Sequence, residues 1–258
     1  MNKIILITRA SSGLGASLCD HYASPNVDMI LLARREEMLE SVAKRCRLKG
    51  ARVFTYQCDV TNQEKMSLMA KDVIANVGCP DIIIANAGVR FEEGENFENL
   101  HSYSSNIEVN YYGVVNTFLP FIPIFKIKNK GHFVSISSIG ALRATPNSGA
   151  YSASKAALNL WTESLRLRLK IHNIVVTNIC LGFVDTSMTS SLDFWMPGML
   201  SSDEAAKKIS KAVESKKREV MLPFIARFIW TVFICMPGRL YDWFILLMRE
   251  IIPKKNKK

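Results

Sequence analysis

Residues 3–15 of the chain read KIILITRASSGLG, an apolar run that passes directly into a turn rich in serine and glycine. An apolar run without alternating polar residues predicts a strand that is covered on both faces. We expect a helix to follow the turn and to continue through Tyr22. A glycine turn between a strand and a helix lets the backbone approach a ligand closely and presents free N–H groups, which favours a bound phosphate.

Similar short runs rich in apolar and β-branched residues recur along the chain, and each predicts a further strand. They are Met29–Ala33, Val53–Gln57, Ile82–Ala85, His132–Ile136 and Ile174–Cys180. Segments long enough for helices separate them, among them Glu36–Lys49, Gln63–Val77 and Tyr151–His172. Because strands that alternate with helices form parallel sheets through right-handed crossovers, the pattern predicts one doubly wound α/β domain over residues 1–222.

The composition of the 258 residues is that of a globular protein, with 48% hydrophobic and 22% charged residues, and it excludes wholesale disorder. The six cysteines contain no Cys-x-x-Cys pair and the four histidines form no cluster, so we expect neither a disulfide framework nor a metal site. The apolar run after Lys3 is too short for a signal peptide. We therefore expect a cytoplasmic protein.

Residues 223–258 form an apolar and basic extension that we do not expect to be an independent domain. The segment Phe224–Met236 is apolar apart from Arg227 and Thr231, but a bilayer span needs about 20 apolar residues. A second apolar segment, Arg239–Ile252, leads to four lysines within the last five residues.

Two roles fit this extension. Apolar residues beside a basic end are typical of a peripheral anchor on an anionic membrane, here its cytoplasmic face. Alternatively, the two segments form helices that cap a substrate cleft, and both roles can hold at once. The part of the chain from Lys216 onward carries ten basic and three acidic residues and so most of the net charge of +10. Nucleic-acid binding is not expected, because no aromatic residues lie among the lysines.

The strongest chemical signal is the segment YSASK at residues 151–155. Residues four apart share one face of a helix, so the Tyr151 hydroxyl and the Lys155 ammonium point the same way. A fixed cation lowers the pKa of a phenol, which is about 10 in water, toward the neutral range that proton transfer requires. Ser138, which follows the strand His132–Ile136, is expected to hold a substrate oxygen beside this hydroxyl.

The second predicted strand ends at Arg34 and Arg35, where a site for NAD usually carries an acidic residue that binds the ribose 2′-hydroxyl. Guanidinium groups instead bind a 2′-phosphate through forked, charge-assisted hydrogen bonds. We therefore expect NADP rather than NAD. The alternative for these two arginines is a solvated, basic start of a helix.

Taken in order, these motifs resemble the short-chain dehydrogenase/reductase family, and the likeness covers the chain from Lys3 to Thr186. The resemblance implies a Rossmann fold, in which residues 86–88 form the family's Asn-Ala-Gly turn. The catalytic residues that it implies are Asn110, Ser138, Tyr151 and Lys155. The cofactor-binding residues that we expect are Thr8, Ser11, Ser12, Gly13, Leu14, Gly15, Arg34, Arg35, Asp59, Val60, Asn86, Ala87, Gly88, Tyr151, Lys155, Gly182, Val184 and Thr186.

Two positions depart from the family's pattern. The first glycine of its glycine motif is Arg9 here, and its Pro-Gly pair after the sixth strand is Leu181-Gly182. A side chain at Arg9 either obstructs the tight turn or contacts a phosphate of the cofactor. Both departures bear on cofactor binding, and neither changes the acid/base residues.

The resemblance implies an NADP(H)-dependent oxidoreductase that transfers hydride between nicotinamide and a carbonyl or alcohol, with Tyr151 as the acid or base. Lys155 is expected to bind the nicotinamide ribose and Asn110 to hold a water molecule that relays protons. Residues 186–205 are expected to form a lid over the substrate. A small hydrophobic substrate is indicated by four large residues of this lid, Phe194, Trp195, Met196 and Met199.

An alternative function is a catalytically weak or inactive NADP(H)-binding sensor at a membrane surface, which the departure at Arg9 favours. The complete set of acid/base residues favours an enzyme, because a binding protein has no need of a polarised tyrosine. The family's dimer interface lies on the helix that begins near Tyr151 and on the helix that contains Asn110, so the resemblance also implies a homodimer.

Overall fold

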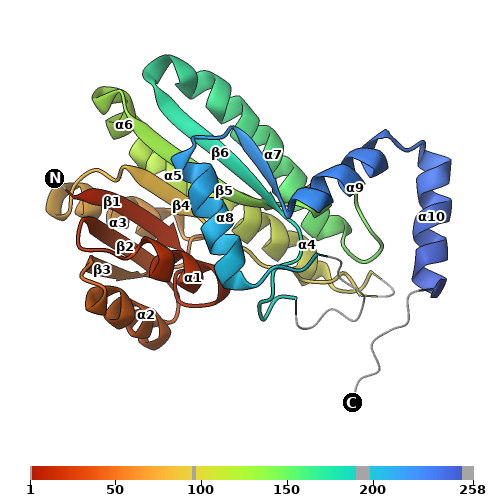
Figure 1. The fold of residues 1–258 in the computed structure, drawn as a ribbon, viewed down its shortest axis with the longest axis horizontal. Helices are drawn as coiled ribbons and strands as arrows, with labels where there is room; N and C mark the ends of the chain where they lie inside the picture. Colours follow the sequence, from red (N-terminus) through yellow and green to blue (C-terminus); the bar gives the residue numbers. More distant parts are fainter. Residues whose placement is uncertain (1, 95–96, 190–197, 252–258) are drawn as a thin grey trace.

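The computed structural model describes residues 2–94, 97–189 and 198–251. In this part of the chain, seven parallel strands form one sheet in the order β3-β2-β1-β4-β5-β6-β7, with helices on both faces (Figure 1). The strands are β1 (Lys3–Thr8), β2 (Val27–Ala33), β3 (Arg52–Gln57), β4 (Ile82–Ala85), β5 (Gly131–Ser138), β6 (Ile174–Leu181) and β7 (Glu219–Leu222). The predicted doubly wound sheet is confirmed, and the six predicted runs are β1 to β6.

Two layers of helices cover the sheet. One layer holds α1 (Gly13–Tyr22), α2 (Glu36–Leu48) and α8 (Ser202–Glu214). The other holds α3 (Gln63–Asn76), α4 (Leu100–Ile107), α5 (Gly113–Phe118), α6 (Ile122–Lys128) and α7 (Gly149–Leu169). In β1, Ile5 and Ile7 pack in the first layer's core and Leu6 packs in the second, and all three are fully buried. This double burial explains the unbroken apolar runs of the sequence.

The order of the strands reverses between β1 and β4, because the chain builds β2 and β3 on one side of β1 and the later strands on the other. In doubly wound sheets, the carboxyl ends of the strands open into a crevice at such a point. Thr8 fixes the two ends there. It is fully buried, and its Oγ1 accepts hydrogen bonds from the backbone N–H groups of Asn86 (2.9 Å) and Ala87 (3.0 Å).

β7 and α8 are among the elements that the sequence did not predict. β7 is a strand of four residues that pairs in parallel with β6 at the edge of the sheet. α8 begins with a capping box, in which Ser201 and Glu204 each accept a hydrogen bond from the other's backbone N–H. Its apolar face, which includes Ala205 and Ile209, is buried, so the end of the predicted lid (186–205) overlaps the start of a core helix.

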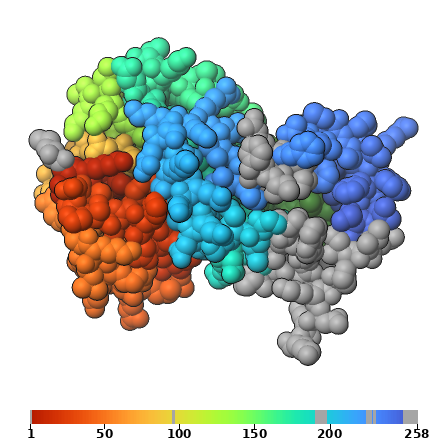
Figure 2. Space-filling view, viewed as in Figure 1, coloured from red at the N-terminus to blue at the C-terminus, as the bar shows by residue number. Residues whose placement is uncertain are grey.

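Two further helices, α9 (Phe224–Cys235) and α10 (Gly238–Ile251), follow β7 and stand at one end of the molecule (Figures 1 and 2). Within the residues that the structure describes, no helix combines the length and the apolar content that crossing a bilayer requires.

Replacing Thr8 by valine removes the hydroxyl group and keeps the shape of the side chain, so the buried N–H groups of Asn86 and Ala87 lose their acceptor. An unsatisfied buried polar group costs about 1–3 kcal/mol. We expect T8V to lower the free energy of unfolding in urea by about 2–4 kcal/mol. T8S keeps the acceptor and should lose about 1 kcal/mol, the contribution of one methyl group. Equal stability of the two variants would contradict this role of Thr8.

Candidate active site

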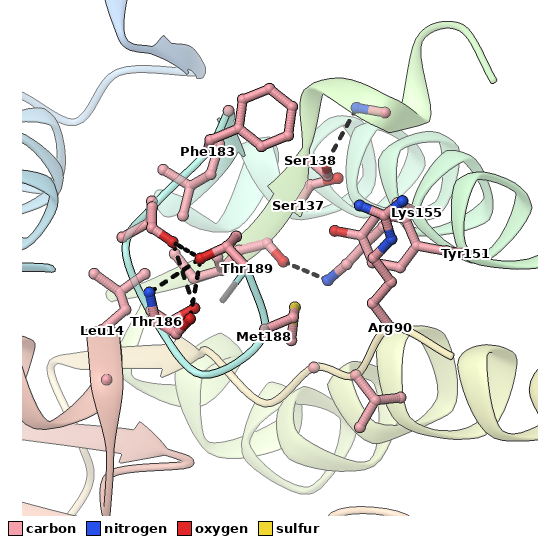
Figure 3. Close-up of a pocket in the computed structure, with 18 of the residues that line it drawn as sticks. Leu14, Arg90, Ser137, Ser138, Tyr151, Lys155, Phe183, Thr186, Met188 and Thr189 are labelled. Carbon is pink, nitrogen blue, oxygen red and sulfur yellow. Dashed lines mark hydrogen bonds between the residues drawn. The ribbon is translucent and has the colours of Figure 1, made fainter. Parts of the chain in front are cut away.

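A groove runs along the carboxyl edge of the sheet and consists of two adjoining pockets. The first contains Ser138, Tyr151 and Lys155 together with the start of α1 (Figure 3). The second lies beside Arg34 and Asp59. The residues that line both pockets are Arg9, Ser12, Gly88, Val89 and Ser187. Every residue predicted to bind the cofactor lines one of the two pockets, with the exception of Thr8.

The first turn of α1 allows a close approach of the backbone. Gly13 has a φ of +51°, in the left-handed region that favours glycine. A Cβ atom on Gly15 would lie 2.0 Å from the Arg9 carbonyl oxygen and 2.7 Å from the Asn86 side-chain nitrogen, so only glycine fits there. The start of α1 lines the groove. Its free N–H groups and the positive end of its helix dipole favour an anion there.

The second pocket carries two exposed guanidinium groups at the end of β2. Nη1 of Arg34 lies 3.6 Å from a carboxylate oxygen of Asp59. Arg35 donates a hydrogen bond of 3.2 Å to Oγ of Ser12, in the turn before α1. Exposed ion pairs contribute little to stability, so both guanidinium groups are available to a phosphate that enters this pocket.

Ser138 and Tyr151 meet in the first pocket. Oγ of Ser138, at the end of β5, accepts a hydrogen bond from the Gly140 N–H (3.1 Å), which fixes the position of this oxygen. Burial raises the pKa of the Tyr151 phenol above its ordinary value. The hydrogen bond with Ser138 and the positive charges of Arg90 and Arg9 lower it, without offsetting the effect of burial.

Lys155 reaches the same pocket from α7, one helical turn after Tyr151. Its Nζ donates a hydrogen bond of 2.9 Å to the backbone carbonyl of Ile136. Burial, and then the charge of Arg9, lower the pKa of the ammonium group to about 8. The sequence predicts that Lys155 lowers the pKa of Tyr151, whereas in the structure the lowering comes from Ser138, Arg90 and Arg9.

Arg90 is a residue of the site that the sequence motifs do not single out. The centre of its guanidinium group lies 5.6 Å from the centroid of the Tyr151 ring (Figure 3). Its Nε is buried and has no hydrogen-bond partner among the described residues. The only signal in the sequence is its place two residues after the Asn-Ala-Gly turn, because a loop at the end of a strand reaches into the crevice.

The side chains of two predicted residues, Asn110 and Thr8, do not line the groove. Asn110 lies in a π-helical turn (Glu108–Tyr112) between α4 and α5 and is fully buried. Its amide accepts a hydrogen bond from the Val89 N–H (2.8 Å) and donates to the Val89 carbonyl (2.9 Å) and to Oγ of Ser154 (3.0 Å). Its side chain thus positions the loop after β4, and Thr8 supports the same loop from β1. That Thr8 also binds the cofactor stays a prediction.

The loop after β6 forms the remaining wall of the first pocket and includes Gly182, Val184 and Thr186. Oγ1 of Thr189 accepts a hydrogen bond from the Thr186 N–H (3.1 Å) and donates to the Val184 carbonyl (2.7 Å), which closes the loop on itself (Figure 3). The Thr186 methyl group would lie 3.2 Å from a Cβ atom on Gly13, so this loop touches the glycine turn.

The predicted lid is only partly within the described residues. Phe194, Trp195 and Met196 lie outside them. Met199, which lies just before α8, is 45% exposed. The lid and its contact with a substrate remain predictions.

The family model of short chain dehydrogenases matches residues 3–197. The chain belongs to this family. It is therefore an oxidoreductase of the short-chain dehydrogenase type, as its motifs predict.

Two relatives of this short-chain dehydrogenase illustrate the range of the family. An uncharacterized oxidoreductase of Mycobacterium tuberculosis (strain ATCC 25618 / H37Rv) is 34% identical over 229 residues, which are 86% of this chain and 67% of the relative. A fatty acyl-CoA reductase of Acinetobacter baylyi (strain ATCC 33305 / BD413 / ADP1) is 31% identical over 222 residues, which are 84% of this chain and 75% of the relative.

Solved structures of other dehydrogenases share the fold. An alcohol dehydrogenase from the archaeon Thermococcus sibiricus, complexed with 5-hydroxy-NADP, has a TM-score of 0.77 at 26% identity and covers 86% of this chain and 96% of its own. A short-chain dehydrogenase from Sphingobium yanoikuyae, in complex with NADPH, has a TM-score of 0.79 at 22% identity and covers 99% and 98%.

The contact between Arg90 and Tyr151 leads to a prediction about the phenol. The positive charge of Arg90 favours the phenolate, so its removal in R90M should raise the pKa of Tyr151 and move tyrosinate formation to higher pH. Ultraviolet difference spectroscopy against a Y151F background isolates this titration from those of the other tyrosines. R90K keeps the charge and should shift the titration less. Coincident titrations of R90M and the wild type would contradict the assignment.

Proposed function

We propose that this short-chain dehydrogenase is an NADP(H)-dependent oxidoreductase that transfers hydride between nicotinamide and a carbonyl or alcohol of a hydrophobic substrate. The observation that carries the proposal is the meeting of Ser138, Tyr151 and Lys155 in one pocket, directly beside the glycine turn at the start of α1. A reactive hydroxyl and an anion-binding turn in one groove suit hydride transfer better than binding alone.

The groove has the chemical features that the phosphates of this dinucleotide require. The start of α1, next to Ser12 and Gly13, suits the pyrophosphate. The exposed guanidinium groups of Arg34 and Arg35 suit a 2′-phosphate, which NADP carries and NAD lacks. The complex of the Thermococcus sibiricus enzyme with 5-hydroxy-NADP supports this choice of cofactor.

Each residue of the first pocket then has a separate role. A bound nicotinamide would supply or accept the hydride. Tyr151 donates a proton to the carbonyl oxygen during reduction, and its phenolate accepts one during oxidation. Ser138 holds the same oxygen by a hydrogen bond, because its Oγ is fixed at the end of β5. Lys155, fixed at the Ile136 carbonyl, presents its remaining N–H groups to the ribose.

The wall of the first pocket supports an apolar substrate. Leu14, Ile139, Phe183 and Met188 line it. Figure 3 shows Leu14 and Phe183 on the side of the pocket that faces Tyr151. Pockets lined by apolar side chains with a few polar groups bind ligands of the same character. The Acinetobacter baylyi relative, which is named a fatty acyl-CoA reductase, further supports a substrate with an apolar chain.

Replacing Tyr151 by phenylalanine tests the proposal, because it removes the proton donor and keeps the ring. We expect Y151F to lower kcat at least about a hundredfold on a panel of apolar ketones and aldehydes. Its affinity for NADPH, measured by fluorescence titration, should stay close to that of the wild type. Y56F is the matched control, because the Tyr56 hydroxyl bonds to Asp72 at the surface.

Two outcomes would speak against the proposal. Near-full turnover by Y151F would contradict the role of the phenol. Tight NADPH binding by the wild type without turnover on any member of the panel would favour the alternative, a binding protein that senses the cofactor.

The C-terminal helices have features of both predicted roles. Tyr241 of α10 is buried, and its hydroxyl donates a hydrogen bond of 2.7 Å to the Ala144 carbonyl, while the Arg143 guanidinium lies 4.1 Å from its ring. Because Thr145 lines the first pocket, this contact fixes α10 beside the active site. Other apolar side chains of the two helices are exposed, namely Phe228, Val232, Ile234, Leu240, Trp243 and Leu246.

We propose that these exposed side chains contact the cytoplasmic face of a membrane, with the basic end of the chain beside the anionic headgroups. The replacement W243D introduces a negative charge at a side chain that is 60% exposed. We expect it to reduce binding to anionic vesicles at least about fivefold in a pelleting assay. L48D is the matched control, because Leu48 at the end of α2 is 88% exposed and belongs to neither helix. Unchanged pelleting of W243D would leave capping of the pocket as the role of α10.

The surface of the second helical layer supports a homodimer. Leu160 and Leu167 of α7 are 71% and 60% exposed, and Leu100 of the neighbouring α4 is 78% exposed. Large apolar side chains gathered on a surface favour burial against a partner. We propose that these two helices form the interface between two copies of the chain.

A further inference from the structure

Arg9 occupies the centre of the groove, at the position where the family's glycine motif has its first glycine. Its backbone has a φ of +51°, in the left-handed region that side chains rarely adopt. Its Nη1 donates a hydrogen bond of 2.8 Å to the backbone carbonyl of Gly88, which links the loop after β1 to the loop after β4. The side chain therefore lies at the boundary of the two pockets and lines both.

The electrostatic surroundings of Arg9 are strongly positive. Burial lowers the pKa of its guanidinium group, and the charges of Arg34 and Arg35 lower it further. Arg9 in turn lowers the pKa of Lys155 at the other end of the groove. Among the described residues, no carboxylate forms an ion pair with Arg9 or Lys155, and the one acidic partner in the groove, Asp59, pairs with Arg34.

A cation that is partly buried without a counter-ion is unfavourable, and so is a left-handed backbone at a residue other than glycine. Both costs occur at one residue, which points to an anionic ligand. Arg9 lies between the adenosine end, marked by Arg34 and Arg35, and the nicotinamide end, marked by Tyr151 and Lys155. In a dinucleotide, the group at this central place is the pyrophosphate, and the start of α1 lies in the same pocket.

We propose that Arg9 is a ligand of the cofactor's pyrophosphate. The guanidinium group leaves the Gly88 carbonyl when the dinucleotide enters and forms charge-assisted hydrogen bonds to the phosphate oxygens. In the family, the glycine at this position lets the backbone approach the pyrophosphate. Here the charged side chain of Arg9 would bind the pyrophosphate instead. This inference rests on the proposed function, because it assumes that the groove binds a dinucleotide.

The replacement R9G restores the family's glycine. It distinguishes two roles of Arg9, as a ligand of the cofactor or as an obstruction of the groove. If Arg9 binds the pyrophosphate, R9G weakens the binding of both NADPH and NADH by a similar factor, about ten- to a hundredfold, in fluorescence titrations. The same factor for both is expected because the two cofactors share the pyrophosphate and differ in the 2′-phosphate. The affinity of R9G should also depend less steeply on salt concentration than that of the wild type.

K216G is the matched control. Lys216 is also a cation with a left-handed backbone (φ of +49°), and it is exposed. It lines a pocket at the amino edge of the sheet, opposite the groove, together with Lys3 and Gly131. The variant therefore repeats the chemical change of R9G without touching the groove, and its affinity for both cofactors should equal that of the wild type. Thermal unfolding is measured to check that both variants are folded. We expect both to be, because glycine adopts the left-handed backbone conformation without strain.

Three results would overturn the proposal. Equal or tighter binding of both cofactors by R9G would show that Arg9 obstructs the groove. A loss confined to NADPH would assign Arg9 to the 2′-phosphate instead of the pyrophosphate. An equal loss of cofactor affinity in K216G would show that removing any positive charge from the protein weakens binding. If the wild type itself binds neither NADPH nor NADH, the proposed function fails, and this outcome is distinct from the other three.

Discussion

Two cations at the carboxyl edge of the sheet, the half-buried Arg9 and the buried Lys155, set the electrostatics of the groove. Within the described residues, neither forms an ion pair, and the hydrogen bonds that hold them go to backbone carbonyls, those of Gly88 and Ile136. The topology causes this, because parallel strands end at one edge and bring the loops after them together. An anion offsets the cost of burying these charges, so the fold itself favours a phosphate-bearing ligand.

The same surroundings govern the phenol of Tyr151. Burial raises its pKa, so without a ligand the hydroxyl group is protonated at neutral pH and able to donate a proton to a carbonyl oxygen. Oxidation of an alcohol requires the phenolate, which the positive charges of Arg90 and Arg9 stabilise. The pH range in which Tyr151 acts as an acid or as a base is therefore linked to how strongly bound ligands screen these two guanidinium groups.

The fold was predictable because the inner strands β1, β2, β4, β5 and β6 are mostly buried, which leaves apolar runs in the sequence. The edge strand β3 was predictable from its β-branched and aromatic residues, although much of it is exposed. β7 was not, since it is a short edge strand whose residues are at most half-buried. The motifs predicted Ser138, Tyr151 and Lys155 in one pocket, because strand ends and helical spacing fix where they lie. The supporting roles of Thr8 and Asn110 and the contact of Arg90 with the ring depend on loops after β4, whose path is determined by tertiary contacts alone.

The number of protons taken up when NADPH binds tests most directly whether the phosphates of the cofactor stabilise the positive charge of Lys155. Because the pKa of Lys155 is about 8, Lys155 is protonated in about half of the protein molecules at pH 8 before NADPH binds. Phosphate groups in the groove raise this pKa, so calorimetry in buffers of different ionisation enthalpy should show uptake of protons by the wild type and none by K155Q. Binding without proton uptake, or with release of protons, would contradict the account.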